Sequence, residues 1–329
     1  MKRRAFISLL GGAAVTWPLA ARAQQGERMR RVAVVMQYVE TDPQGQLRAA
    51  AFREGLEKAG WVSGRNISVD YLWGVLDSQW TRGITEHLRQ RVPDVIAINS
   101  SIGLRAIESA APGVPIVFIA VSEPVAQGFV ASLARPGGNI TGFALFEFAI
   151  GAKWLELLKQ IAPSVTRVAV IYDPATPNAT GFLPMIEAAG RSFGVDVFAY
   201  SVRDTAETER IITTFAAEPN GGLIPVASAL MGNQRDFIIS LAHRYRLPNV
   251  FAFRYYPANG GLASYGVDPI NLYKRAASYV DRILKGEKPA DLPVQMANKY
   301  ELVINLKTAK ALGLDIPVSV LARTDEVIE

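Results

Sequence analysis

The chain has 329 residues, half of them apolar and a fifth charged, which is the composition of a globular protein too long for a single hydrophobic core. Its 35 basic residues exceed its 30 acidic ones, but four of the basic residues lie in the first 23 positions, so the remainder carries a net charge of only +1 and offers no basic surface for nucleic acid. The absence of Cys and the presence of only two His exclude disulfides and thiolate sites, and we expect neither a metal site nor a cofactor.

Residues 1–23 have the pattern of a cleaved export signal. A basic start is followed by an apolar run to Ala20, and the Ala-Arg-Ala sequence predicts cleavage after Ala23. The adjacent Arg3 and Arg4 resemble a twin-arginine signal, with an ordinary secretory leader as the alternative. Because the apolar run spans about 15 residues and a bilayer needs roughly 20, we expect a soluble protein exported to the periplasm.

Short apolar runs alternate with helical patterns in the first half of the mature chain. Such alternation predicts an α/β fold with a parallel, doubly wound sheet, in which ligands bind outside the carboxyl ends of the strands. We expect strands at 32–36, 67–72, 94–99 and 116–121, and helices at 43–59, 78–91 and 103–110, with a further short helix ending near Leu133.

The pair Ser100 and Ser101 stands where the third strand ends and a helix begins. A Ser at this position caps the free N–H groups of the first helical turn. A helix N-terminus also attracts anions, because its N–H groups are unpaired and its dipole is positive there. Capping alone and capping combined with carboxylate binding both remain open.

The second half of the chain repeats the first. Arg167–Ile171 repeats the pattern of Arg31–Val35, and the stretch Gly137–Phe148 separates the two series as an extended segment that belongs to neither. Two further crossings are expected at 260–268 and 286–293, with the helix 272–284 returned to the first lobe. We therefore predict an N-terminal lobe of residues 29–143 plus 266–288 and a C-terminal lobe of residues 144–262 plus 292–329. In the second lobe, strands are expected at 168–172, 195–200, 223–226 and 249–254, and helices at 153–161, 183–193, 207–217 and 233–245.

Four segments carry a resemblance to a known family. They are Phe52–Trp61, Ser132–Gly142, Ser264–Asp268 and Leu302–Leu314, together with the leader. In sequence and order they resemble the periplasmic substrate-binding proteins of ABC transporters, and they are most similar to the group that includes tryptophan and tyrosine uptake proteins. The resemblance extends over essentially the whole chain.

This resemblance implies a type I periplasmic-binding fold, with two doubly wound lobes and three crossing segments. It also implies a monomer that closes on a small molecule and delivers it to a membrane permease. The implied ligand-binding residues lie at strand ends that face the cleft, or on the crossings. They are Gln37, Tyr38, Trp73, Ser100, Ser101, Ser122, Glu123, Asp173, Asn178, Ser228, Ala229, Tyr265 and Asp268, and to these we add the aromatic residues Phe143 and Phe146.

We expect the ligand to be an amino acid or an aromatic or apolar carboxylate. Its carboxylate would bind at Ser100 and Ser101, and Glu123 or Asp268 would take an amino group. The flat apolar walls would come from Trp73, Tyr38, Phe143 and Phe146, because aromatic faces hold rings well.

Two other functions fit the same architecture. The chain has no Gly-rich phosphate loop, no H-E-x-x-H and no G-x-S-x-G, so an enzyme would have to be a hydrolase or lyase that uses carboxylates such as Glu123 and Asp268. Alternatively, the two lobes could form a sensor module that presents its closed form to a membrane receptor.

Overall fold

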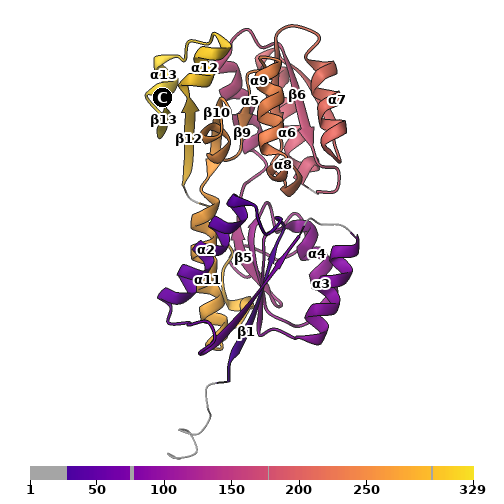
Figure 1. The fold of residues 1–329 in the computed structure, drawn as a ribbon, viewed down its shortest axis with the longest axis vertical. Coiled ribbons are helices and arrows are strands. Elements are labelled where there is room, and N and C mark those ends of the chain that lie inside the picture. Colours follow the sequence, from indigo (N-terminus) through magenta and orange to yellow (C-terminus); the bar gives the residue numbers. More distant parts are fainter. Residues whose placement is uncertain (1–27, 75–77, 177, 298) are drawn as a thin grey trace, which may run out of the picture.

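The computed structural model describes residues 28–74, 78–176, 178–297 and 299–329, so the expected export signal lies outside the described residues. The protein consists of two α/β lobes stacked along its long axis (Figure 1). Within the described ranges, no helix combines the length and the apolar character that crossing a bilayer requires.

The first lobe is built on a six-stranded parallel sheet whose central strands are short apolar runs. Helices cover both faces of this sheet, α2 and α11 on one side and α3 and α4 on the other (Figure 1), which is why the central strands β3 and β4 are apolar throughout rather than alternating. The strand order is β11 (Gln295–Met296), β5 (Ile140–Ala144), β4 (Ile116–Val121), β3 (Val95–Ile98), β1 (Arg30–Met36) and β2 (Ile67–Trp73). The helices are α2 (Pro43–Lys58), α3 (Ser78–Gln90), α4 (Ser101–Ala110) and α11 (Pro269–Leu284), and a short 3-10 turn covers Pro289–Asp291.

The second lobe repeats this layout with two smaller sheets that a bridge between Leu223 and Asn249 connects. The parallel sheet has the order β7 (Asp196–Ser201), β6 (Arg167–Tyr172) and β8 (Gly221–Pro225). The mixed sheet has the order β13 (Glu326–Ile328), β12 (Tyr300–Asn305), β10 (Ala263–Val267) and β9 (Val250–Phe251). The helices are α5 (Ile150–Ile161), α6 (Asn178–Phe193), α7 (Thr205–Phe215), α8 (Ala229–Asn233), α9 (Arg235–Arg244), α10 (Tyr255–Ala258), α12 (Leu306–Leu312) and α13 (Val318–Leu321).

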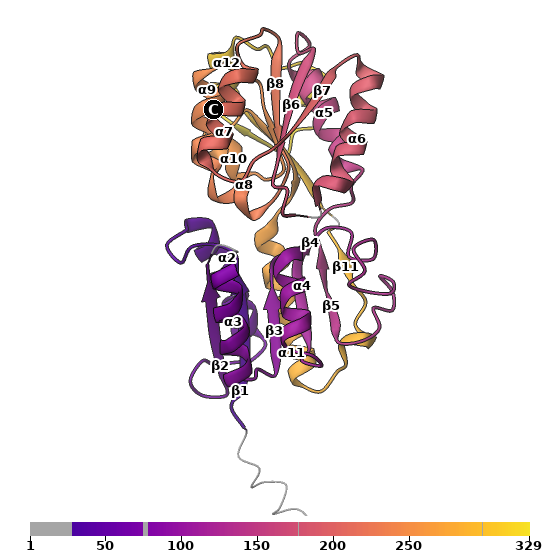
Figure 2. The same ribbon diagram turned by 90° about the vertical axis from the view of Figure 1, so that its right-hand side faces the viewer.

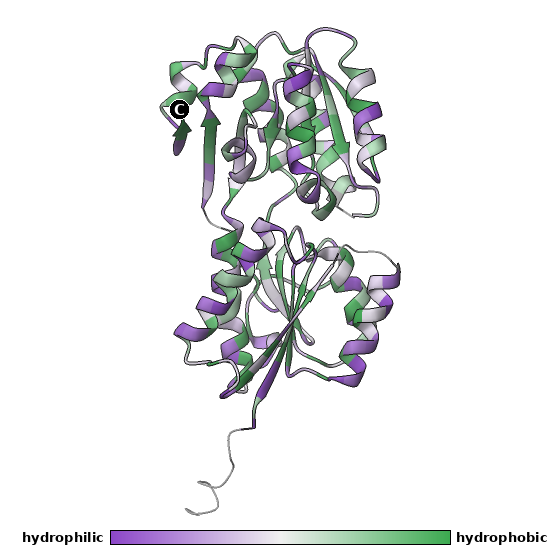
Figure 3. Ribbon diagram, viewed as in Figure 1, coloured by the Kyte–Doolittle hydropathy of each residue, from purple (hydrophilic) through white to green (hydrophobic). Residues whose placement is uncertain are grey.

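Apolar residues concentrate in the strands and on the inner helix faces, and polar residues line the outer helix faces (Figure 3). The carboxyl ends of the first lobe's parallel strands point toward the second lobe, and the loops after β6 and β8 point back toward the first (Figure 2). The two sets of strand ends therefore meet at the junction of the lobes, where binding is expected in this class of sheet.

The chain passes between the lobes three times, after β5, after β10 and after β11. Three details differ from the sequence expectation. The segment thought to belong to neither lobe contains β5, which pairs with β4 in the first sheet. The third crossing comes later than 286–293, because Gln295 and Met296 still pair with β5. No helix ends near Leu133; that stretch is a series of turns.

Helix α11 returns to the first lobe, as expected, and packs directly against α2 at Gly55. A Cβ atom added at Gly55 would stand 2.6 Å from the Ala277 Cβ atom and 2.9 Å from the Lys274 carbonyl oxygen. Both distances are shorter than van der Waals contact, so the two helices approach this closely only because position 55 has no side chain.

We therefore expect Gly55→Ala to lower the free energy of unfolding by about 1–3 kcal/mol through overpacking. Gly83→Ala on α3 is the control, because nothing lies within 4 Å of its added Cβ and the change should stabilise the helix by about 0.5–1 kcal/mol. Urea denaturation measures both, and equal stabilisation by the two substitutions would contradict the packing argument.

Candidate functional site

An interlobe cavity of about 80 Å³ lies where the two sets of strand ends meet. This volume is enough for several water molecules. The cavity is lined by residues of both lobes and by α11, and none of the lining residues is acidic. The first lobe, α11 and the end of β5 contribute Gln37, Tyr38, Arg48, Asn99, Ser100, Ser101, Ala120, Leu145, Pro269 and Tyr273, and the second lobe contributes Thr176, Ala227, Ser228, Ala229, Phe253 and Tyr255.

Six of the residues expected from the sequence line this cavity. They are Gln37, Tyr38, Ser100, Ser101, Ser228 and Ala229. Ser100 and Ser228 hold equivalent places in the two lobes, because each caps the helix that follows a strand. The Ser100 hydroxyl accepts the Gly103 N–H at 3.2 Å, and the Ser228 hydroxyl accepts the Met231 N–H at 3.2 Å.

Two buried polar side chains at the cavity have atoms without a hydrogen-bond partner in the described part of the chain. Gln37 is 2% exposed, and its Nε2 makes no hydrogen bond, although its backbone N–H donates to Asn99 Oδ1 at 3.0 Å. The Tyr273 hydroxyl is also buried and unpartnered. Burial raises the pKa of Tyr273 well above its usual value, so the hydroxyl stays protonated and available as a donor.

A larger outer cavity of about 480 Å³ adjoins the interlobe cavity, and the two share Gln37, Thr176 and Ala229. Asp173, another expected site residue, lines this outer cavity at the end of β6. Burial raises the pKa of Asp173, and the Ala175 N–H that donates to its Oδ1 at 2.9 Å partly offsets this. The side chain of Asn178 lies outside the described residues.

Three expected residues at strand ends of the first lobe do not line either cavity. Trp73 stacks on Tyr71 with ring centroids 6.0 Å apart. Ser122 is buried within the first lobe, 1% exposed. Glu123 turns toward the hinge, where its Oε1 accepts the Phe148 N–H at 3.2 Å.

Four expected residues on or near the crossings serve the core and the hinge. Phe143 is buried in the first lobe against Tyr279, with ring centroids 4.7 Å apart. Asp268 caps α11 by accepting the Ile270 N–H at 2.8 Å. Phe146 and Tyr265 belong to an aromatic cluster at the hinge, in which both rings stack on Tyr300. The apolar wall at the site therefore differs from the one expected.

The cavity's actual aromatic and cationic lining includes Arg48, Phe253, Tyr255 and Tyr273, which sequence reasoning missed. Arg48 and Tyr273 lie on helices whose sequences indicate ordinary packing faces. Tyr255 begins a short helix just after the strand expected at 249–254. The sequence contains one indication that Arg48 is unusual. It precedes Phe52 by four residues, so it belongs to the buried stripe of α2, where a cation is out of place.

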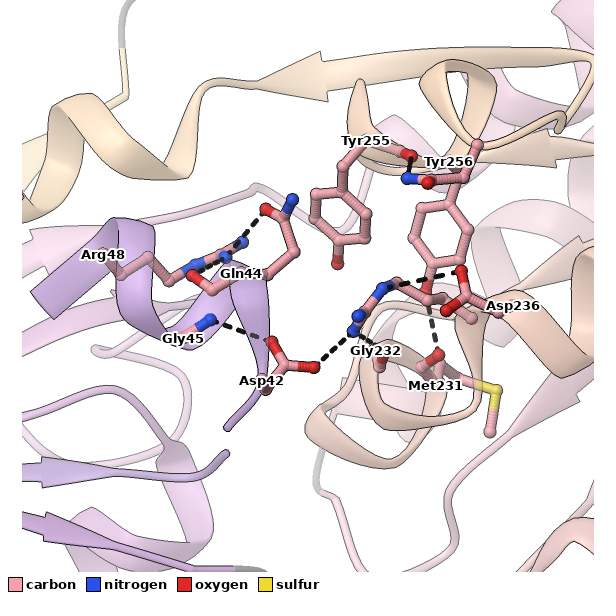
Figure 4. A network of polar contacts seen from close by, with 11 residues as sticks. Asp42, Gln44, Gly45, Arg48, Met231, Gly232, Asp236, Tyr255 and Tyr256 are labelled. Carbon is pink, nitrogen blue, oxygen red and sulfur yellow. Dashed lines mark hydrogen bonds and ion pairs between the residues drawn. The ribbon is translucent and has the colours of Figure 1, made fainter. Parts of the chain in front are cut away.

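A buried ion pair joins the lobes beside the cavity (Figure 4). Asp42 caps α2 through its Oδ1, which accepts the Gly45 N–H at 2.9 Å, while its Oδ2 accepts from Arg235 Nη1 at 2.6 Å. The two side chains are 8% and 10% exposed. Arg235 Nη1 also donates to the Gly232 carbonyl at 3.0 Å. Because the partners belong to different lobes, the pair forms only when the lobes are together.

Comparison with known proteins places the chain in context. Residues 31–328 match a family described as ABC transporter substrate binding protein. A tyrosine-binding protein of Clostridioides difficile (strain R20291) is 25% identical over 263 residues, which cover 80% of this chain and 75% of the relative.

Solved structures match over 91% of the chain. A conserved domain protein from Vibrio cholerae has a TM-score of 0.84 at 28% identity and is covered completely. An ABC domain from Streptococcus pneumonia in complex with L-Trp has a TM-score of 0.83 at 24% identity, and 99% of it is covered. The ligand-free, open structure of a substrate-binding protein with adhesive properties from Clostridium difficile has a TM-score of 0.65 at 25% identity, and 99% of it is covered as well. At nearly equal identity, the TM-score is higher for the L-Trp complex than for the ligand-free, open structure.

We expect Asp42→Asn to shift the protein toward an open arrangement. Asn preserves the helix cap but loses its charge, and Arg235, left with only the exposed Asp236 as a charged partner at 3.8 Å, is better hydrated when the lobes separate. Small-angle X-ray scattering should show a larger radius of gyration. The control is Glu54→Gln, which removes one charge from the exposed face of the same helix, where Glu54 pairs with Lys58 and Lys274 of the same lobe. Identical scattering from Asp42→Asn and the unsubstituted protein would rule out this role.

Proposed function

The chain belongs to the family of ABC transporter substrate-binding proteins, and on this premise we propose that it captures a small organic carboxylate between its lobes and delivers it to a membrane permease. One observation carries the choice of ligand class. The interlobe cavity presents buried donors and aromatic rings, and no acidic side chain lines it. A solute with an anionic group and a flat apolar portion matches such a lining.

The first turn of α4 supports a carboxylate at Ser100 and Ser101. The first N–H groups of a helix have no partner within the helix, and the dipole adds partial positive charge at the same place. Among the described residues, Gln37 Nε2 and the Tyr273 hydroxyl are donors without a partner, and both residues line this cavity. A carboxylate, which only accepts hydrogen bonds, would satisfy several of these donors together.

The rings of Tyr38, Phe253, Tyr255 and Tyr273 form the apolar part of the site in this proposal. The tyrosine-binding relative and the L-Trp complex support an aromatic amino acid as the ligand. Its ammonium group would reach Asp173 in the outer cavity, because Glu123 and Asp268 do not line either cavity. An ammonium group beside Asp173 would favour the charged carboxylate and so offset the desolvation that raises its pKa.

In this proposal, closure of the two lobes is the step that distinguishes the ligand-bound protein from the free protein. A ligand shifts an open-to-closed equilibrium only by its differential affinity for the two forms, so contacts from both lobes are needed. The cavity lining supplies them.

The family is one of binding proteins rather than enzymes, which sets aside the hydrolase or lyase alternative. An exported protein of this family would meet its permease outside the cytoplasmic membrane.

A thermal-shift screen tests the ligand class. We expect L-tyrosine, L-tryptophan or phenylpyruvate to raise the melting temperature, since a ligand present at 100 times its dissociation constant stabilises the folded state by about 2.7 kcal/mol. The matched amines tyramine and tryptamine lack the carboxylate and should leave it unchanged. The ligand class would be wrong if the amines stabilised the protein as well as the acids do.

Replacing Ser100 and Ser101 together with Ala should weaken binding of the best carboxylate roughly 10- to 100-fold, because hydrogen bonds to a charged group are lost. The substitution also removes a helix cap, which costs about 1 kcal/mol of stability. Asp204→Ala is the matched control, since Asp204 caps α7 in the same way but lines neither cavity. Isothermal titration calorimetry measures the affinities, and an equal dissociation constant in the double variant would exclude this anion site.

A further inference from the structure

Arg48 is a buried cation at the wall of the interlobe cavity. It is 2% exposed and projects from α2, one helical turn after Gln44. Its Nη1 donates to the Gln44 carbonyl at 2.7 Å and to the Gln44 Oε1 at 3.1 Å (Figure 4). Among the described residues, Nε and Nη2 have no hydrogen-bond acceptor, so one edge of the guanidinium is available to another partner.

The charge of Arg48 has no paired carboxylate in the described part of the chain. Asp42 is near enough to favour the cation electrostatically, but both of its oxygens are engaged, one by Gly45 and the other by Arg235. An arginine cannot escape the cost of burial by losing its proton. A buried cation without an anion is therefore destabilising unless something else balances it.

Part of the balance comes from two aromatic faces. The Arg48 guanidinium carbon lies 5.2 Å from the centroid of Tyr38 and 5.4 Å from that of Tyr255. Both distances are within the range of a cation–π interaction. Tyr38 belongs to the first lobe and Tyr255 to the second, so Arg48 is held between the lobes as well as beside the cavity.

We propose that Arg48 is the counter-charge for the ligand's carboxylate. This inference rests on the proposed function and names the residue that selects an anion. The free edge of a guanidinium matches the two oxygens of a carboxylate, and Tyr273, which lines the same cavity, offers a further donor. Because the cavity measures about 80 Å³, a carboxylate inside it lies close both to Arg48 and to the first turn of α4.

This arrangement couples anion binding to closure. The Tyr255 ring reaches Arg48 only when the lobes are together. An anion paired with the guanidinium fixes the orientation in which both rings contact it. Arg48 is thus a specificity-determining residue whose contacts are completed by the second lobe.

The rival account is that Arg48 serves only as a cation–π link between the lobes. In that case its loss would weaken all ligands alike, because it would hinder closure without affecting the recognition of charge. The two accounts differ in one measurable quantity, the ratio of affinities for a carboxylate and for its neutral primary amide.

The experiment uses three matched pairs of probes: L-tyrosine and L-tyrosinamide, L-tryptophan and L-tryptophanamide, and phenylacetate and phenylacetamide. Dissociation constants are measured by calorimetry for the unsubstituted protein, Arg48→Gln, Arg48→Lys and the control Arg53→Gln, which removes a charge from the exposed face of the same helix. Circular dichroism melting verifies that each variant is folded.

We expect Arg48→Gln to bind the carboxylates roughly 10- to 100-fold more weakly and to bind the amides unchanged, so that the preference disappears. Arg48→Lys should retain the preference for carboxylates over amides at reduced affinity, because lysine keeps the positive charge but lacks the planar guanidinium group. Arg53→Gln should match the unsubstituted protein.

A folded Arg48→Gln variant that keeps the full preference for carboxylates would overturn the role of Arg48, as would an equal loss for both members of each pair. Either result would leave the proposed ligand class intact. Failure of every carboxylate to bind the unsubstituted protein would instead overturn the ligand class itself, so the two failures are distinguishable.

Discussion

The ion pair between Asp42 and Arg235 is the contact on which the geometry of the site depends. Asp42 both begins α2 and binds Arg235, the first residue of α9. The N-cap of α2 is therefore tied directly to the second lobe. Arg48 follows less than two turns later, and this places its guanidinium against Tyr255 of the opposite lobe. Loss of the pair would free the two walls of the cavity from each other.

The sequence predicted the architecture well because apolar runs of strand length, separated by helical patterns, have few other solutions than parallel doubly wound sheets. It failed where the local signal was short or ambiguous. The two residues of β11 show no periodicity, so the third crossing was placed too early. The glycines around β5, among them Gly142 with a φ of 154°, made a strand of the first sheet look like a linker.

Several of the residues expected at strand ends line the interlobe cavity, whereas Trp73, Ser122 and Glu123 do not, and the helical residues that line it were not expected. Gln37, Ser100 and Ser228 follow buried strands, and topology brings the ends of such strands together. Arg48 and Tyr273 lie on α2 and α11, whose inward faces are core along most of their length. Sequence alone does not show where such a face stops covering the sheet and begins to line a cleft, because that depends on how the second lobe is placed.

In the proposed mechanism, two opposing effects would set how readily the lobes close. The closed arrangement contains the Asp42–Arg235 pair and the contact of Arg48 with Tyr255, but in it Gln37 Nε2 and the Tyr273 hydroxyl are buried without a partner among the described residues. Unsatisfied buried donors are unfavourable by about 1–3 kcal/mol each, which is comparable to what a buried contact between lobes returns. A solute that accepts hydrogen bonds removes that penalty only in the closed form. In the proposed mechanism, the donors that make closure unfavourable by itself would also make it responsive to a carboxylate, whereas a purely apolar solute would leave the penalty in place.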